Sequence, residues 1–194
     1  MRFIIILILP SLILLAAAIL FDINYINYKP PIPYSEWPKI NFYDFRALKK
    51  PGVTLSGVKE FAYIKTNRII YYLNNGDVEI ITYFHPSRSY VFAQDIRSAD
   101  LLKHELYHFH ISEYYSRLLR KEVFNQRNRL TKSEMEDLRR KYYLLENKEQ
   151  DEYDENSYHS YVMKEQRKWE IKIDSMLQSL EEFSKPVVHM VNRE

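Results

Sequence analysis

The chain contains no cysteine in its 194 residues. This absence excludes a disulfide framework, a zinc ribbon and a thiol nucleophile. A strong excess of one charge is also absent, because 28 basic and 26 acidic residues leave a formal net charge of +2. Nucleic-acid binding therefore has no electrostatic support. Any metal ion must be held by histidine and carboxylate side chains, and any hydrolysis must use activated water or a hydroxyl group.

Glycine and proline are absent from residues 99–125, and this stretch is typical of a helix. Ser98 and Asp100 supply a capping signal at its start. Within it, residues 104–108 match the motif His-Glu-x-x-His. The opposite side of the helix is apolar and suited to a core, through Leu102, Leu106 and Phe109. The alternative is an exposed, charged helical turn that holds two histidines by chance.

The spacing of this motif predicts a metal site. On a helix, His104 and His108 lie within about 40° of each other, so both imidazoles can reach one Zn²⁺ at about 2.0–2.1 Å. Glu105 lies about 100° round from His104 and cannot complete the same ligand plane. It is placed instead to take a proton from a metal-bound water. We therefore predict that His104 and His108 bind Zn²⁺ and that Glu105 is the catalytic base.

Two histidines leave the zinc short of ligands, because catalytic sites usually hold three protein ligands and a water. The downstream candidates are Asp154, Glu155 and His159, near the predicted start of the last helix. We predict His159 as the third ligand, because on that helix it can point inward towards the metal. Asp154 is the alternative ligand, or a group that orients one. A capping or core role is the structural alternative for a single histidine such as His159.

The sequence also bears on side chains outside the predicted ligand set. His110 lies about 240° round from His104, so it is expected at the surface or behind a ligand. Tyr114 stands six residues after His108, where the long metzincin motif has a third histidine, and this excludes that subclass. An oxyanion formed at the site could be stabilised by a donor such as Tyr153, Tyr158 or Arg88.

Residues 3–21 carry no charge and are almost entirely apolar. A run of 19 residues can just span a bilayer, and Arg2 before it favours a cytoplasmic N-terminus. The small residues 16–18 also offer a cleavage site. We predict that residues 1–22 form a hydrophobic helix, either a signal peptide or a membrane anchor. The protein is then extracytoplasmic, periplasmic or secreted, and held at the inner membrane if the segment is retained.

The central part of the chain predicts a small sheet. Four prolines in residues 23–38 indicate an extended linker, after which the folded domain spans residues 39–185. Residues 68–73 and 78–84 are β-rich and are joined by an Asn-Asn-Gly-Asp turn, which is typical of an antiparallel hairpin. In zinc peptidases a strand before the metal helix commonly pairs with an extended substrate, and we assign that role to residues 80–85.

The carboxyl half predicts further helices. Residues 131–134 form a capping box that opens a helix to about Asn147. A polar loop is expected over 148–156, a last helix over 157–184, and a tail over 186–194. Together these patterns predict an α+β fold. In it, a small antiparallel or mixed sheet packs on the His-Glu-x-x-His helix and on C-terminal helices.

Several motifs resemble those of the bacterial family of predicted secreted zinc-dependent proteases, a domain of unknown function. In order over most of residues 40–180, the marks are Asn41-Phe42-Tyr43-Asp44-Phe45, Ser89-Tyr90-Val91, Leu102-x-His104-Glu105-x-x-His108-Phe109, Arg117-x-x-Arg120, Tyr153-Asp154-x-x-Ser157-x-His159 and Gln166-x-x-Trp169. The chain departs from the family at Leu106, His110, Ser157 and Ser160, where the family usually has Gln, Asp, Thr and Gly. The resemblance implies a zincin-like fold, zinc and peptidase-like hydrolysis, but no particular substrate.

The sequence thus predicts an exported zinc metallopeptidase whose partner is a peptide or protein substrate. His104, His108 and His159 are expected to hold Zn²⁺, and Glu105 to pass a proton from water to the leaving amine. The rival hypothesis is a non-catalytic metal-binding or scaffold protein of the cell envelope. Glu105 discriminates between the two, because a purely structural zinc site has no need of it.

Overall fold

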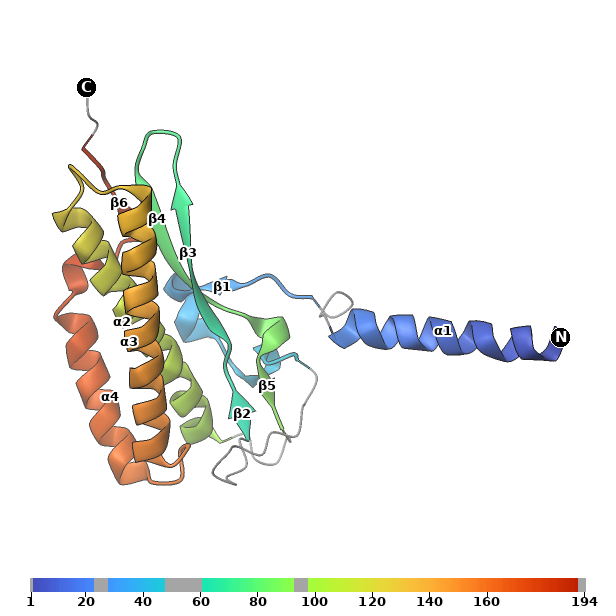
Figure 1. Cartoon of the computed structure of the whole chain (residues 1–194). Coiled ribbons are helices and arrows are strands. Elements are labelled where there is room, and N and C mark those ends of the chain that lie inside the picture. The colour runs from blue at the N-terminus through green and yellow to red at the C-terminus, as the bar shows by residue number, and fades with distance from the viewer. Residues whose placement is uncertain (1, 23–27, 48–60, 93–97, 192–194) are drawn as a thin grey trace.

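The protein has an α+β fold in which helix α2 packs on a small antiparallel sheet, and two further helices pack on α2 (Figure 1). A computed structural model describes residues 2–22, 28–47, 61–92 and 98–191. The predicted α+β class is confirmed, including the small antiparallel sheet packed on the His-Glu-x-x-His helix.

Helices α2 and α3 begin where the sequence provides caps. The Ser98 side chain accepts a hydrogen bond from the Leu101 N–H at the start of α2. Thr131 and Glu134 form the predicted capping box at the start of α3. The helices that surround the site are α2 (Ala99–Asn125), α3 (Lys132–Ser157) and α4 (Met163–Gln178).

The predicted loop over 148–156 is wrong, because α3 continues through it. The stretch contains neither proline nor glycine, and ion pairs such as Lys148–Glu152, at 3.6 Å, join successive turns. Tyr153 is fully buried, so tertiary packing also holds this part helical. The predicted last helix over 157–184 is correspondingly shorter, since the α-helix in that range, α4, ends at Gln178 and is followed by a short 3₁₀ helix. Asp154 therefore lies on a helix, in its last turn.

The sheet is built around the predicted hairpin of β3 (Thr66–Tyr72) and β4 (Val78–Phe84), which pair antiparallel along their whole length. On the other side of β4, β1 (Ile32–Pro33) pairs with one end and β6 (Val187–Val188) with the other. Between β1 and β6, the Arg120 guanidinium donates to the Ile80 carbonyl from Nε at 3.0 Å and from Nη2 at 2.7 Å. Strand β4 is therefore covered on both sides.

The expectation that residues 80–85 pair with a substrate is wrong, and β3 offers the open edge instead. Ile80 donates its backbone N–H to the Pro186 carbonyl, so its polar groups face away from β3. Its partner Ile70 must then turn its own N–H and C=O away from β4, and so must Arg68 and Thr66 by alternation. No strand in the described part of the chain pairs with that edge.

Both ends of the folded domain extend past the predicted boundaries. Strand β1 lies within the predicted linker of residues 23–38, where Pro33 is tolerated because the strand is short and at an edge. Strand β6 lies within the predicted tail of residues 186–194. Residues 23–27 and 192–194 lie outside the described residues. The smaller elements are β2 (Ala62–Tyr63), paired with β5 (Tyr90–Val91), and the 3₁₀ helices Tyr34–Lys39, Phe42–Asp44, Pro86–Arg88 and Glu181–Phe183.

Helix α1 (Arg2–Asp22) extends away from the domain and contains Pro10 (Figure 1). Among the residues that the structure describes, no helix is long and apolar enough to cross a membrane. The side chains of residues 2–9 and 21–22 lie outside that description, and the predicted signal peptide or anchor depends on them.

A buried charge network fixes α2 on the sheet. The Glu113 carboxylate accepts from Thr82 Oγ1 at 2.6 Å, from Arg117 Nε at 3.2 Å and from Arg120 Nη1 at 2.8 Å. Arg117 and Arg120 also donate to the backbone carbonyls of Leu177 and Phe183. These buried charges are hydrogen-bonded only when α2 has one particular orientation about its own axis, so the network fixes that orientation. That rotation turns the motif towards α3 and the open side of β3.

Candidate metal centre

Three donor atoms from α2 and α3 meet at one point. The Nε2 atoms of His104 and His108 are 3.3 Å apart, and Asp154 Oδ1 lies 3.1 Å from the first and 2.9 Å from the second. A tetrahedral Zn²⁺ with bonds of about 2.0–2.1 Å holds its ligand atoms about 3.3–3.4 Å apart. The three atoms thus have nearly the spacing of a tetrahedral face. Within the described residues they form the one group of histidine and carboxylate ligands that could hold a metal ion.

Packing around the cluster orients both imidazoles. The Tyr153 ring stacks on His104, with centroids 4.7 Å apart, and meets His108 edge-on at 4.9 Å. His104 Nδ1 is buried and has no partner among the described residues, so only Nε2 of that ring takes part in the cluster. The next residue after Tyr153 is Asp154, and the end of α3 therefore supplies both the ring that packs on the two imidazoles and the carboxylate oxygen of the cluster.

Gln150 sets the tautomer of His108, and sequence reasoning missed it. Its Nε2 donates to the His108 carbonyl at 3.0 Å and to Ser112 Oγ at 3.2 Å, so its Oε1 accepts from His108 Nδ1 at 2.5 Å. The proton is thereby held on Nδ1, and Nε2 is aimed at the cluster. The signal that could have found Gln150 is its place four residues before Asp154, on the same face of a helix.

Burial and the Asp154 carboxylate set the charges of the cluster. Burial lowers the pKa of His104 to about 4. Burial also acts to lower the pKa of His108, but the charge and hydrogen bond of Asp154 outweigh it and raise this pKa to about 9. The pKa of Asp154, which burial alone would raise, is held well below its usual range by His108 and His104. At neutral pH the metal-free cluster therefore contains a neutral His104, a protonated His108 and an ionised Asp154.

Zinc binding is expected to release about one proton per chain at pH 7.5, because His108 must deprotonate before its Nε2 can coordinate. Below pH 9, the pKa of His108, the apparent affinity for zinc should rise about tenfold per pH unit, and it should level off above. Calorimetry in two buffers of different ionisation enthalpy measures the release. His110→Asn is a control, since burial lowers the pKa of His110 to about 4 and its ring is not part of the His104, His108 and Asp154 cluster. A release close to zero protons would contradict the raised pKa.

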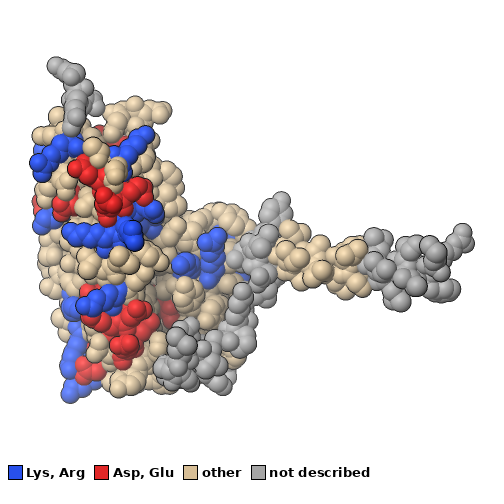
Figure 2. Space-filling model, in the orientation of Figure 1, with Lys and Arg blue, Asp and Glu red and all other residues tan. Residues whose placement is uncertain are grey.

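The cluster lies in a cavity of about 940 Å³ between α3 on one side and β2–β3 on the other, with α2 as the floor. Glu105 borders this cavity, is 4% exposed, and its charge contributes to the raised pKa of His108. Its carboxylate therefore lies at the same cavity as the cluster and acts electrostatically on His108. Figure 2 shows acidic side chains gathered over the lower part of α3, where this helix borders the strands.

The structure favours Asp154 over His159 as the third ligand, which reverses the preference stated from the sequence. His159 also borders the cavity, and its Nδ1 lies 3.5 Å from Asp154 Oδ1, but it is not part of the mutually close donor set. The physical reason is the length of α3. Asp154 is carried on the helix, whereas His159 follows its end in a left-handed turn.

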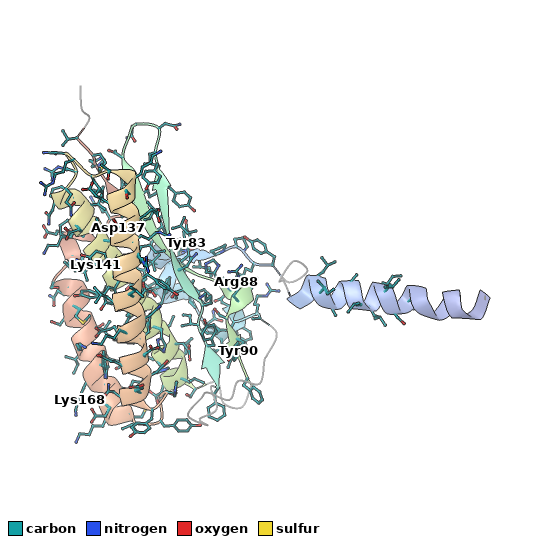
Figure 3. All side chains as sticks on the ribbon, in the orientation of Figure 1. Tyr83, Arg88, Tyr90, Asp137, Lys141 and Lys168 are labelled. Atoms are coloured by element: carbon teal, nitrogen blue, oxygen red, sulfur yellow. The ribbon has the colours of Figure 1, made fainter. Side chains whose placement is uncertain are left out.

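The predicted oxyanion donors do not border the cavity. Tyr153 is fully buried, and its hydroxyl donates to the His104 carbonyl at 3.4 Å. Tyr158 is 61% exposed. Arg88 lies in the β-rich half that faces α1, on the far side from α3 and α4 (Figure 3).

His110 points away from the cluster, as predicted, but it is buried and not at the surface. Its Nδ1 lies 2.8 Å from the Tyr34 hydroxyl, and its ring packs edge-on against Trp37 and Tyr107. It therefore anchors the N-terminal segment to α2.

Comparison with known proteins finds no relative, since no protein-family model, no curated protein and no solved structure matches this chain. The resemblance to predicted secreted zinc-dependent proteases therefore stays a prediction from motifs.

Proposed function

We propose that this protein is a zinc-dependent hydrolase that cleaves peptide bonds, with a zincin-like arrangement around α2. The observation that carries the proposal is the convergence of His104, His108 and Asp154 in a cavity that also contains Glu105. Two imidazole nitrogens and one carboxylate oxygen are a donor set of catalytic zinc sites, which keep a fourth position open. A structural zinc site, by contrast, is usually closed by four protein ligands.

Bound Zn²⁺ supplies a Lewis acid that polarises a carbonyl and lowers the pKa of a coordinated water to about 7. Glu105 accepts a proton from the attacking water, whose oxygen bonds to the carbonyl carbon. Glu105 then gives that proton to the amide nitrogen as the C–N bond breaks. The products are a carboxylic acid and an amine. Burial of Glu105 keeps bulk water away from this proton and strengthens its interaction with the site.

The open edge of β3 supports an extended peptide as the substrate. Thr66, Arg68 and Ile70 offer backbone N–H and C=O groups there, and pairing with them binds a peptide without demanding a particular sequence. The cavity follows α3 from Glu136 to Asp154, which is about 27 Å of helix. That length accommodates about eight residues of an extended chain.

We further propose that residues 3–21 export the protein or retain it at the membrane, so that the site works outside the cytoplasm. The apolar character of this run and the single preceding arginine support this orientation.

The test is metal analysis of the full chain combined with hydrolysis of fluorescein-labelled casein. We expect one zinc per chain, loss of hydrolysis on treatment with 1,10-phenanthroline, and recovery on addition of zinc. Asp154→Ala should weaken zinc binding by more than about 100-fold, since it removes a ligand and not merely a supporting group. Asp151→Ala is the matched control, because Asp151 is one turn away on α3, exposed, and outside the donor set. Zinc binding without any hydrolysis would support the rival metal-binding scaffold.

A further inference from the structure

The turn after α3 is unusual in its backbone. Tyr158, His159 and Ser160 have φ angles of 50°, 50° and 73°, so three successive residues other than glycine are left-handed. The turn closes with the two bonds of a Schellman motif, from His159 N to the Asp154 carbonyl at 3.0 Å and from Tyr158 N to the Glu155 carbonyl at 3.4 Å. Glycine is the usual residue at such a position. Strain of this kind persists where the surrounding structure enforces it, often at functional sites.

This turn carries His159 to the edge of the metal centre. The side chain is 22% exposed, borders the cavity, and places Nδ1 3.5 Å from Asp154 Oδ1. On a continued helix, His159 would lie about 140° round from Asp154. The left-handed turn instead leaves its Nδ1 3.5 Å from Asp154 Oδ1. The left-handed backbone therefore determines where the His159 imidazole lies.

The geometry argues against His159 as a ligand of the same ion. A fourth tetrahedral ligand would lie about 3.3–3.4 Å from each of the other three donor atoms. His159 approaches Asp154 but stays outside the set in which all donor atoms are within 4.8 Å of one another. Its imidazole therefore borders the cavity next to Asp154 and lies outside the donor set.

We infer that His159 donates a hydrogen bond to the carbonyl oxygen of the peptide bond that is cleaved. This inference rests on the proposed function. As water adds to the carbonyl carbon, that oxygen gains negative charge, and an N–H aimed at it stabilises the transition state more than the substrate. The donors predicted from the sequence do not border the cavity, whereas His159 does. Its role is thus catalytic but distinct from metal binding.

The experiment compares His159→Ala and His159→Gln in the full chain, because glutamine keeps an N–H donor and is a poor zinc ligand. His159→Ala should lower kcat on labelled casein by about 10²–10³-fold with little change in KM. The kcat of His159→Gln should be at least about tenfold higher than that of His159→Ala. Both variants should keep one metal per chain, and the visible absorption of the cobalt-substituted protein should match that of the unaltered chain. An altered cobalt spectrum or lost metal would overturn the inference, as would a kcat within threefold of the unaltered chain.

A binding measurement separates this inference from the proposed function. Acetohydroxamate, titrated into the cobalt-substituted protein, presents an oxygen near the open position without requiring hydrolysis. Its affinity should fall about tenfold in His159→Ala and be restored in His159→Gln. If the unaltered chain does not hydrolyse casein but this pattern holds, the peptidase proposal fails and the donor role of His159 stands. Equal affinities in all three proteins would overturn the donor role, whether or not casein is cleaved.

Discussion

Replacing Glu105 by glutamine is expected to lower kcat for casein hydrolysis by about 10²–10⁴-fold while one zinc stays bound. The amide fills the same space but cannot accept a proton from the attacking water. Glu105 is 4% exposed and outside the donor set, so the change should leave the three ligand atoms in place. A steady-state kinetic assay and metal analysis of the same sample measure both effects.

The control for this prediction is Glu122→Gln, which makes the same chemical change on the same helix. Glu122 lies near the far end of α2, does not border the cavity, and accepts a hydrogen bond from Gln126. Its kcat should stay within about twofold of the unaltered chain. If Glu105→Gln cleaves casein as fast as the unaltered chain, Glu105 is not the base. If it loses zinc, Glu105 is part of the metal centre itself.

Replacing Glu113 by alanine is expected to lower the free energy of unfolding by about 3–5 kcal/mol, the usual effect of removing one partner of a buried ion pair. Glu113 is 1% exposed, and its carboxylate is shared by Arg117 and Arg120, which are themselves buried. Without it, Arg120 keeps its bonds to the Ile80 and Phe183 carbonyls but has no buried counter-charge. Urea unfolding followed by circular dichroism gives the difference.

Glu136→Ala serves as the comparison for Glu113, since it removes a carboxylate from an exposed ion pair. Glu136 and Arg139 are each 58% exposed, so the loss should stay below about 1 kcal/mol. Equal effects of the two substitutions would show that the buried network does not fix α2 on the sheet. A large effect at Glu113 with zinc affinity also reduced would support the view that this network orients the motif.

Much of the site's local structure could be predicted from the sequence. The start of α2 at Ser98, the capping box at Thr131 and Glu134, and the hairpin between β3 and β4 all formed as expected. Each depends on residues within a few positions of one another, and such short-range preferences do not need the rest of the fold. The same is true of His104 and His108, whose common face follows from helical periodicity alone.

The third ligand could not be derived in this way. Asp154 and His159 are five residues apart, and either could be placed near the metal while the end of α3 was unknown. The end of α3 depends on burial of Tyr153 against α2, a contact between segments about 50 residues apart. The open edge of β3 was likewise decided by long-range pairing, because β1 and β6 come from the two ends of the domain to cover β4.

The sequence by itself determined the chemistry available to this protein: two imidazoles and a carboxylate on one helix, and no thiol. The tertiary structure alone decided which distant carboxylate joins them, which strand lies open beside them, and where His159 points. The reason is that a side chain's local direction follows from backbone geometry, whereas the meeting of two helices depends on the packing of the whole core.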